Sequence, residues 1–314
     1  MPRSTLVVAT ICATMLAAAP RARAQDAAPD TRTDAWLSQP VDDATFRTYL
    51  DFFTYNANLP FNAVIGEVVT QEGVTREHVT FQSTSGMQVT AYVYRPASPS
   101  AVSRGGIIYL HGGSARGKET GAGVKTTMAL DGWTVLSIDL LHYGERRTDV
   151  LTTYANEEKA ERLYNEPATY LAFVEQTAKD ARRGYDFLVQ EHGLDPNRIL
   201  LVGHSRGGVL SSIVGAVETR FAGVVLMHPG HFGLGVQSHQ AAACPANYIG
   251  RISPRPVIMF QTTADSYFLP ESTIRPLVAL ARDPVDVHWG DGPHGFMSED
   301  DMAELLAWLR GVGR

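Results

Sequence analysis

A serine in the middle of the chain has the surroundings of a catalytic nucleophile. Ser205 is the centre of the sequence GHSRG at residues 203–207, which follows the apolar run RILLV and precedes the helix-like stretch GGVLSSIVGAV. A strand, a sharp turn and a helix in this order project a serine hydroxyl from the strand end. The flanking glycines remove side chains that would collide there, and the helix start favours developing negative charge. We therefore predict that Ser205 is a nucleophile; the alternative is a helix-capping serine without chemistry.

A serine hydroxyl needs a base, and the base needs an acid to orient it. His294 lies in the sequence GPHG, a turn-rich loop between the last predicted strand and the last helix. Asp265 follows the apolar run VIMFQ, so its carboxylate is expected at the same sheet edge as Ser205 and His294. Asp139, which follows an earlier strand, is the alternative acid. The resulting chain order is Ser, Asp, His.

Backbone N–H groups beside the serine are expected to stabilise an oxyanion. One is the N–H of Arg206, and the other belongs to the turn HGGS at residues 111–114, where we favour Gly113. The alternative for this turn is an ordinary glycine-rich loop. The Arg206 side chain is expected to pair with Glu145 or, alternatively, with a substrate carboxylate.

Other reactive side chains are weaker candidates. His228 and His231 form the sequence HPGH, but no cysteine or carboxylate cluster accompanies them, so no metal site is predicted. Cys244 lacks a strand–turn–helix setting and is predicted to be an inert or partly buried thiol. No cofactor is expected.

The elements that must position these residues alternate between strands and helices. An antiparallel hairpin is predicted at residues 78–82 and 89–94. Continuous apolar runs are typical of strands buried on both faces of a parallel sheet. Helix-like stretches separate most of these runs, which predicts an α/β fold with helices on both faces of about eight strands. The runs are residues 106–110, 133–141, 198–202, 221–227, 257–261 and 285–289.

The interval between Asp139 and the helix expected from residue 175 is too long for an ordinary connection. Its charged, helix-favouring composition predicts a small helical insertion at about 145–175, lying over the strand ends. Within it, Glu145 and Tyr164 are predicted to contact the substrate. The alternative is a solvated helix with no role at the site.

The N-terminal region has the pattern of a secretory signal peptide. A basic start, an apolar run and small residues ending at Ala24 predict cleavage after residue 24 and a periplasmic or secreted protein. Residues 25–75 are predicted to be a leader and a helix, and residues 76–314 the main domain. The apolar run is short for a membrane span, and no second run reaches spanning length.

Charge and cysteine content exclude several classes of protein. The formal net charge is −6 and no basic stripe is present, so nucleic acid is not an expected partner. Of the two cysteines, Cys12 would leave with the signal peptide, so no disulfide within the mature chain is expected. The sequence does not indicate an oligomeric state.

Five motifs together resemble the α/β-hydrolase superfamily, and within it the group similar to dienelactone hydrolases and acetyl xylan esterases. They are IIYLHGG, DLLHYGERR, GHSRGG, RPVIMFQTTAD and GPHGF, between about residue 76 and the C-terminus. Dienelactone hydrolases proper use cysteine where this chain has Ser205. The resemblance implies hydrolysis of an ester through an acyl-enzyme. The tyrosines of the insertion and the short glycine-rich turn lead us to expect short acyl groups. The alternatives are a peptidase or amidase with the same triad, or a non-catalytic binding protein.

Overall fold

The computed structural model describes residues 35–312, apart from residues 85, 99–102 and 233–238. The expected signal peptide at residues 1–24 lies outside the described residues, as does most of the expected leader. In the part of the chain that is described, no helix is long and apolar enough to cross a membrane.

The described residues form a mostly parallel sheet of nine strands in the order β1-β2-β3-β5-β4-β6-β7-β8-β9. β1, β2 and β3 are antiparallel to one another, and β3 is antiparallel to β5. The remaining pairs are parallel. The strands are β1 (Val64–Gln71), β2 (Val74–Gln82), β3 (Gln88–Pro96), β4 (Gly105–Leu110), β5 (Trp133–Ile138), β6 (Ile199–His204), β7 (Val224–Met227), β8 (Val257–Thr262) and β9 (Val285–Gly290).

The predicted α/β fold is therefore confirmed, with one strand more than expected. The additional strand, β1, lies in the region where only a leader and a helix were predicted. It forms the outer edge of the sheet, and almost all of its residues are exposed. Without a buried face it carries no alternation of apolar and polar residues that would reveal a strand.

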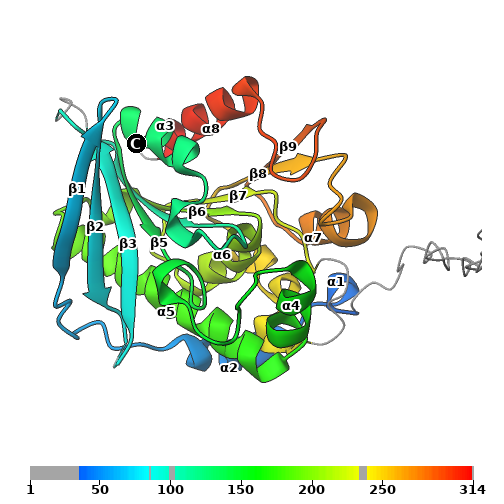
Figure 1. Cartoon of the computed structure of the whole chain (residues 1–314). Coiled ribbons are helices and arrows are strands. Elements are labelled where there is room, and N and C mark those ends of the chain that lie inside the picture. Colours follow the sequence, from blue (N-terminus) through cyan, green and yellow to red (C-terminus); the bar gives the residue numbers. More distant parts are fainter. Residues whose placement is uncertain (1–34, 85, 99–102, 233–238, 313–314) are drawn as a thin grey trace, which may run out of the picture. The chain divides into compact units, whose positions relative to one another are not determined.

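Helices cover both faces of the sheet (Figure 1), and neighbouring residues of one strand enter two separate cores. Ile107 packs in the core that includes residues of α3 and α8, whereas Ile108 packs in the core that includes residues of α5 and α6. This alternation explains why the central strands read as continuous apolar runs. The helices are α1 (Ala35–Ser38), α2 (Asp43–Tyr49), α3 (Ala122–Leu130), α4 (Asn156–Lys159), α5 (Pro167–Gln190), α6 (Arg206–Val217), α7 (Arg275–Ala279) and α8 (Glu299–Val312).

The segment predicted as a helical insertion contains α4 and a π-helical turn, η4 (Ala160–Tyr164), and α5 follows. α5 begins earlier than expected, at Pro167, because proline is well suited to the first helical position. Lys159, Leu163 and Tyr164 are buried. One side of the segment therefore packs on the protein instead of facing water.

The sheet topology brings the predicted site residues to one edge. β4, β6, β8 and β9 run parallel, so the loops that follow them leave from the same end of the sheet. In open α/β sheets this carboxyl edge is where ligand sites form.

Candidate active site

Ser205 occupies a strained turn between β6 and α6. Its backbone has φ +53° and ψ −116°, a conformation that is costly for a residue with a side chain. The turn is held because the Ser205 N–H donates to the carbonyl of Met227 at 2.8 Å. A Cβ at Gly207 would lie 2.0 Å from the carbonyl oxygen of Leu110, and one at Gly203 would lie 2.3 Å from that of Gly207. Both glycines are therefore required by close backbone packing.

The structure brings Ser205, His294 and Asp265 into one hydrogen-bonded chain. Ser205 Oγ lies 2.7 Å from His294 Nε2, and His294 Nδ1 lies 2.6 Å from Asp265 Oδ2. When Nδ1–H donates to the carboxylate, Nε2 is left as the acceptor for the serine hydroxyl. This is the arrangement that general-base activation of a serine requires.

The Asp265 carboxylate is held in its ionised form. Burial by itself raises the pKa of Asp265, but hydrogen bonds from His294 and from the N–H groups of Phe268 and Tyr267 lower it below its ordinary value. The two backbone N–H groups donate to Oδ1 at 2.8 and 2.9 Å, which leaves Oδ2 for the imidazole. The carboxylate therefore carries a negative charge beside the base at neutral pH.

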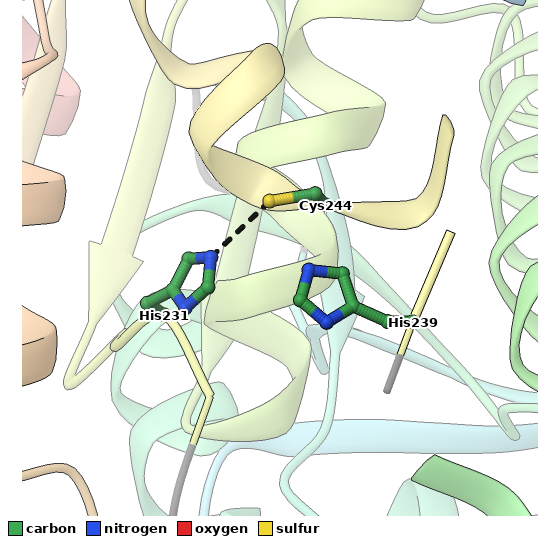
Figure 2. A group of neighbouring side chains, drawn as sticks. All are labelled: His231, His239 and Cys244. Atoms are coloured by element: carbon green, nitrogen blue, oxygen red, sulfur yellow. Dashed lines mark hydrogen bonds between the residues drawn. The ribbon is translucent and has the colours of Figure 1, made fainter. Parts of the chain in front are cut away.

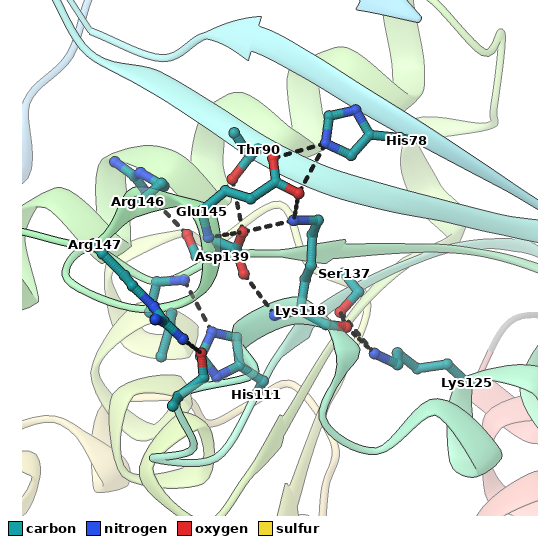
Figure 3. Close-up of polar contacts among 12 residues, drawn as sticks. His78, Thr90, His111, Lys118, Lys125, Ser137, Asp139, Glu145, Arg146 and Arg147 are labelled. Carbon is teal, nitrogen blue, oxygen red and sulfur yellow. Dashed lines mark hydrogen bonds and ion pairs between the residues drawn. The ribbon is translucent and has the colours of Figure 1, made fainter. Parts of the chain in front are cut away.

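The alternative acid, Asp139, has a different set of partners (Figure 3). Its carboxylate accepts hydrogen bonds from Lys118 Nζ at 2.8 Å, the Lys118 N–H at 2.6 Å and Thr90 Oγ1 at 2.7 Å. Burial raises the pKa of Asp139, but these bonds outweigh burial and lower it. The Glu145 N–H also donates to Asp139, at 3.1 Å. Asp139 thus belongs to a buried ion pair that holds the turn after β5.

The expected pairing of Glu145 with Arg206 is wrong. Glu145 contacts Lys118 Nζ at 2.6 Å and His78 Nε2 at 2.9 Å, as Figure 3 shows. Arg206 instead places its guanidinium 3.9 Å from the centre of the Tyr164 ring. The pairing was predicted wrongly because the actual partner of Glu145, Lys118, is distant in sequence and sits in an unpatterned turn.

The glycine turn after β4 lies against the nucleophile. A Cβ at Gly112 would be 3.4 Å from the Cβ of Ser205, and one at Gly113 would be 3.8 Å from the Cβ of Arg206. The turn is positioned by His111, whose Nδ1 contacts the Gly112 carbonyl at 2.6 Å and whose Nε2 accepts from the Leu140 N–H at 3.1 Å. The two residues predicted to supply oxyanion donors are therefore adjacent.

The insertion reaches the glycine turn. Lys159 Nζ donates to the Gly113 carbonyl at 3.1 Å, and Tyr164 Oη lies 3.4 Å from Tyr143 Oη. A Cβ at Gly113 would be 3.8 Å from each of these two hydroxyls. Sequence analysis identified Tyr164 but not Lys159 or Tyr143. Nothing local distinguishes Lys159 from the other charged residues of its segment.

Aromatic rings and neutral histidines surround His294. The ring of Tyr267 stacks on His294 with centroids 5.3 Å apart, and His204 and His228 lie at 6.3 and 5.9 Å. Burial, reinforced by neighbouring histidines, lowers the pKa of His204 to about 3 and that of His228 to about 4. These two rings are therefore neutral at pH 7, and they add no positive charge next to the base.

Comparison with known proteins agrees with the fold. Residues 107–312 match the Alpha/beta hydrolase family, which covers more than half of the chain. The chain belongs to this family.

Three solved structures with a similar fold are esterases. Acetyl xylan esterase 1 from a Thermoanaerobacterium species is 17% identical, with a TM-score of 0.65 over 87% of this chain and 95% of that chain. An acetyl xylan esterase from a Paenibacillus species is 15% identical, with a TM-score of 0.63 over 88% and 98%. A cold-adapted esterase from an Arctic intertidal metagenomic library is 18% identical, with a TM-score of 0.59 over 81% and 99%.

Two curated relatives are much longer than this chain. The multifunctional-autoprocessing repeats-in-toxin proteins of Vibrio cholerae serotype O1 and Vibrio vulnificus are 23% and 24% identical over 207 residues, or 63% of this chain. The chain spans 4% of the length of these relatives. What the whole toxins do is therefore not attributed to this chain.

Proposed function

We propose that this protein hydrolyses carboxylic esters through an acyl-enzyme formed on Ser205. The observation that carries the proposal is the unbroken contact from Ser205 Oγ through His294 to Asp265, at 2.7 and 2.6 Å. The family assignment and the esterases of similar fold support the same reaction class.

In the first half of the reaction, Ser205 Oγ attacks the ester carbonyl as its proton moves to His294 Nε2. Asp265 stabilises the imidazolium that forms. The backbone N–H groups of Gly113 and Arg206 donate hydrogen bonds to the developing oxyanion. The tetrahedral adduct then collapses, His294 returns the proton to the departing alkoxide, and the alcohol leaves. Water attacks the acyl-enzyme by the same path, which releases the acid and restores Ser205.

The side chains beside the glycine turn, those of Tyr143, Tyr164 and Arg206, favour small ester substrates. The hydroxyls of Tyr143 and Tyr164 lie beside Gly113, and the Arg206 guanidinium lies over the Tyr164 ring. Tyrosine rings combine a flat apolar face with a hydrogen-bonding hydroxyl, which suits sugar or aryl alcohols better than long alkyl chains. We therefore propose short-chain esters as substrates. Esters also demand less protonation of the leaving group than amides do.

Steady-state kinetics on p-nitrophenyl esters from acetate to palmitate tests this substrate class. We expect kcat/KM to be greatest at the short end of the series, because acyl selectivity is expressed in kcat/KM. A peptide p-nitroanilide measured in parallel should be cleaved far more slowly. A maximum at palmitate, or faster cleavage of the anilide than of the acetate, would contradict the proposal.

Export through the N-terminal signal is a separate proposal that rests on sequence alone. The intact mass of protein recovered from the exported fraction should correspond to a chain beginning at Gln25. Recovery of an exported chain that still begins at Met1 would contradict cleavage.

A further inference from the structure

A second cluster of chemically reactive side chains lies outside the triad, in the segment that follows β7. It consists of His231, His239 and Cys244, and the ligand atoms of the three residues all lie within 4.8 Å of one another. Figure 2 shows both imidazoles turned toward the sulfur, with His231 Nε2 3.2 Å from Cys244 Sγ. We propose that these three residues bind a zinc ion, with the fourth coordination position open to water.

The donor set fits zinc. Two imidazole nitrogens and one thiolate are ligands that Zn²⁺ prefers, and a soft thiolate disfavours Mg²⁺ and Ca²⁺. With Zn–N near 2.0 Å and Zn–S near 2.3 Å, tetrahedral ligands lie roughly 3.5 Å apart. The His231–Cys244 contact is already close to that spacing. A movement of about 1 Å by the partly exposed ring of His239 closes the remaining gap.

The backbone holds two of the three ligands firmly. Cys244 lies between two short 3₁₀ turns, η6 (Ala241–Ala243) and η7 (Pro245–Asn247), and its N–H donates to the Ala241 carbonyl. The His231 N–H donates to the Thr273 carbonyl at 3.1 Å. Because these anchors belong to separate segments, a bound ion would tie the loop after β7 to the turns around Cys244.

The surroundings exclude water from the sulfur. Cys244 is fully buried and His231 nearly so. The Phe232 ring packs against both imidazoles, with centroids 4.7 Å from His231 and 4.1 Å from His239. An apolar shell of this kind orients the ligands and controls the access of solvent to the metal. The Trp36 ring also contacts His239, with ring centroids 5.2 Å apart.

The cluster is distinct from the catalytic residues. His228 is the other histidine of the HPGH sequence, and it points elsewhere: its Nε2 contacts the Phe296 carbonyl at 2.8 Å and its ring packs on His294. The HPGH sequence thus divides between two sites, His228 beside the base and His231 beside Cys244. The zinc site is therefore separate from the triad, and it does not depend on the proposed esterase reaction.

Binding must release protons, because the ligands act through lone pairs. The proton shared between His231 Nε2 and Cys244 Sγ leaves when both atoms coordinate the ion. No oxidation or reduction is involved. The affinity should therefore fall as the pH is lowered, since protons then compete for both ligands.

Cobalt titration of the full, chelator-treated chain tests the site directly. Co²⁺ takes the same tetrahedral position and, when a thiolate binds it, gives a sulfur-to-metal charge-transfer band in the near ultraviolet. We expect this band to saturate at one equivalent of Co²⁺ and to disappear when Zn²⁺ displaces the cobalt. Ser205→Ala should bind cobalt as the wild type does, which separates this proposal from the esterase proposal.

Two ligand variants and a matched control complete the test. Cys244→Ser should lose the band, and His239→Asn should weaken Co²⁺ binding at least ~100-fold, because removing a ligand costs more than removing its outer partner. His239 is partly exposed, so His239→Asn should fold even if the buried Cys244→Ser variant does not; circular dichroism checks both. Asp286→Asn alters another His-carboxylate group, an exposed one, and should leave binding unchanged. A wild type without the band, or a band that persists in both folded ligand variants, would overturn the proposal.

Discussion

Asp265 and Asp139 occupy equivalent places in the sheet but have different chemical surroundings. Each follows a parallel strand at the carboxyl edge, each is buried, and each accepts two backbone N–H bonds. They differ in the ionisable side chain that contacts the carboxylate. Asp265 faces the imidazole of His294, whereas Asp139 faces the ammonium of Lys118.

The side chain beside each carboxylate, and not the place of the carboxylate in the sheet, decides its role. An imidazole gains and loses a proton during a reaction, so a carboxylate beside it can stabilise a transient charge. Lysine in a buried ion pair keeps its charge, so the carboxylate beside it can only hold structure. Asp265 therefore belongs to the proposed catalytic arrangement at the carboxyl edge, and Asp139 to a structural one.

The largest effect should come from breaking the catalytic arrangement at its centre. Ser205→Ala should lower kcat by about a million-fold, and His294→Ala by a similar factor, because the residues act as a unit. Steady-state kinetics on p-nitrophenyl acetate measures the loss, and thermal unfolding checks that the fold survives. A residual rate within tenfold of wild type in the folded variants would remove Ser205 from the mechanism.

Exchanging each aspartate for asparagine separates the two roles. Asp265→Asn should lower kcat by ~10⁴-fold with little loss of stability, because the base loses its orientation and its counter-charge. Asp139→Asn should keep kcat within about tenfold. It should instead lower the free energy of unfolding by ~3 kcal/mol, because Lys118 loses a buried partner. Kinetics and urea denaturation of both variants decide the assignment; the reverse pattern would make Asp139 the catalytic acid.

A double-mutant cycle on Lys118 and Asp139 tests whether this ion pair stabilises the fold. Lys118→Met and Asp139→Asn should each be destabilising, but the double variant should be more stable than the sum of the single losses by roughly 1–2 kcal/mol. The physical reason is that the double variant leaves neither charge without its partner. Additive losses in urea denaturation would show that Lys118 and Asp139 do not interact in solution.

The neutral histidines around His294 should make the catalytic region sensitive to acid. The pKa of His204 is about 3 in the folded chain and near 6.5 in the unfolded chain, so the unfolded chain binds more protons between these values. Stability is therefore complete above pH 6.5 and falls as the pH is lowered. At pH 5 the loss from this one group is ~2 kcal/mol.

His204→Asn should remove that share of the acid sensitivity. Urea denaturation at pH 7 and pH 5 should show a smaller stability difference for the variant than for the wild type. His288→Asn, at a partly exposed site on β9, serves as the control and should keep the wild-type difference. An unchanged difference in His204→Asn would mean that His204 is protonated equally in the folded and unfolded chains.

Much of the fold, and the contact among Ser205, His294 and Asp265, could be predicted because both depend on local patterns. The apolar runs of β4, β6 and β8 are buried on both faces, and each is followed within a few residues by a glycine turn, Ser205 or Asp265. Parallel strands then bring these residues to the same edge. β1 was missed because an exposed edge strand carries no burial pattern.

The partners of single side chains could not be predicted, because packing between distant segments decides them. Lys118 lies in a short 3₁₀ turn and meets Asp139 and Glu145 only after the strands assemble. His231 and Cys244 are 13 positions apart, and nothing in the local sequence shows that they converge. The same holds for Lys159, which reaches Gly113 from the insertion.

Covalent labelling with a fluorophosphonate tests the central claim most directly, because the reagent traps an activated serine as a stable adduct. Intact-mass analysis and peptide mapping should place one adduct on Ser205 in the wild type and none in Ser205→Ala. Labelling of Asp265→Asn should be much slower than that of Asp139→Asn, since Asp265 is the residue that supports the base. An unlabelled wild-type protein, an adduct on another residue, or faster labelling of Asp265→Asn than of Asp139→Asn would contradict the account.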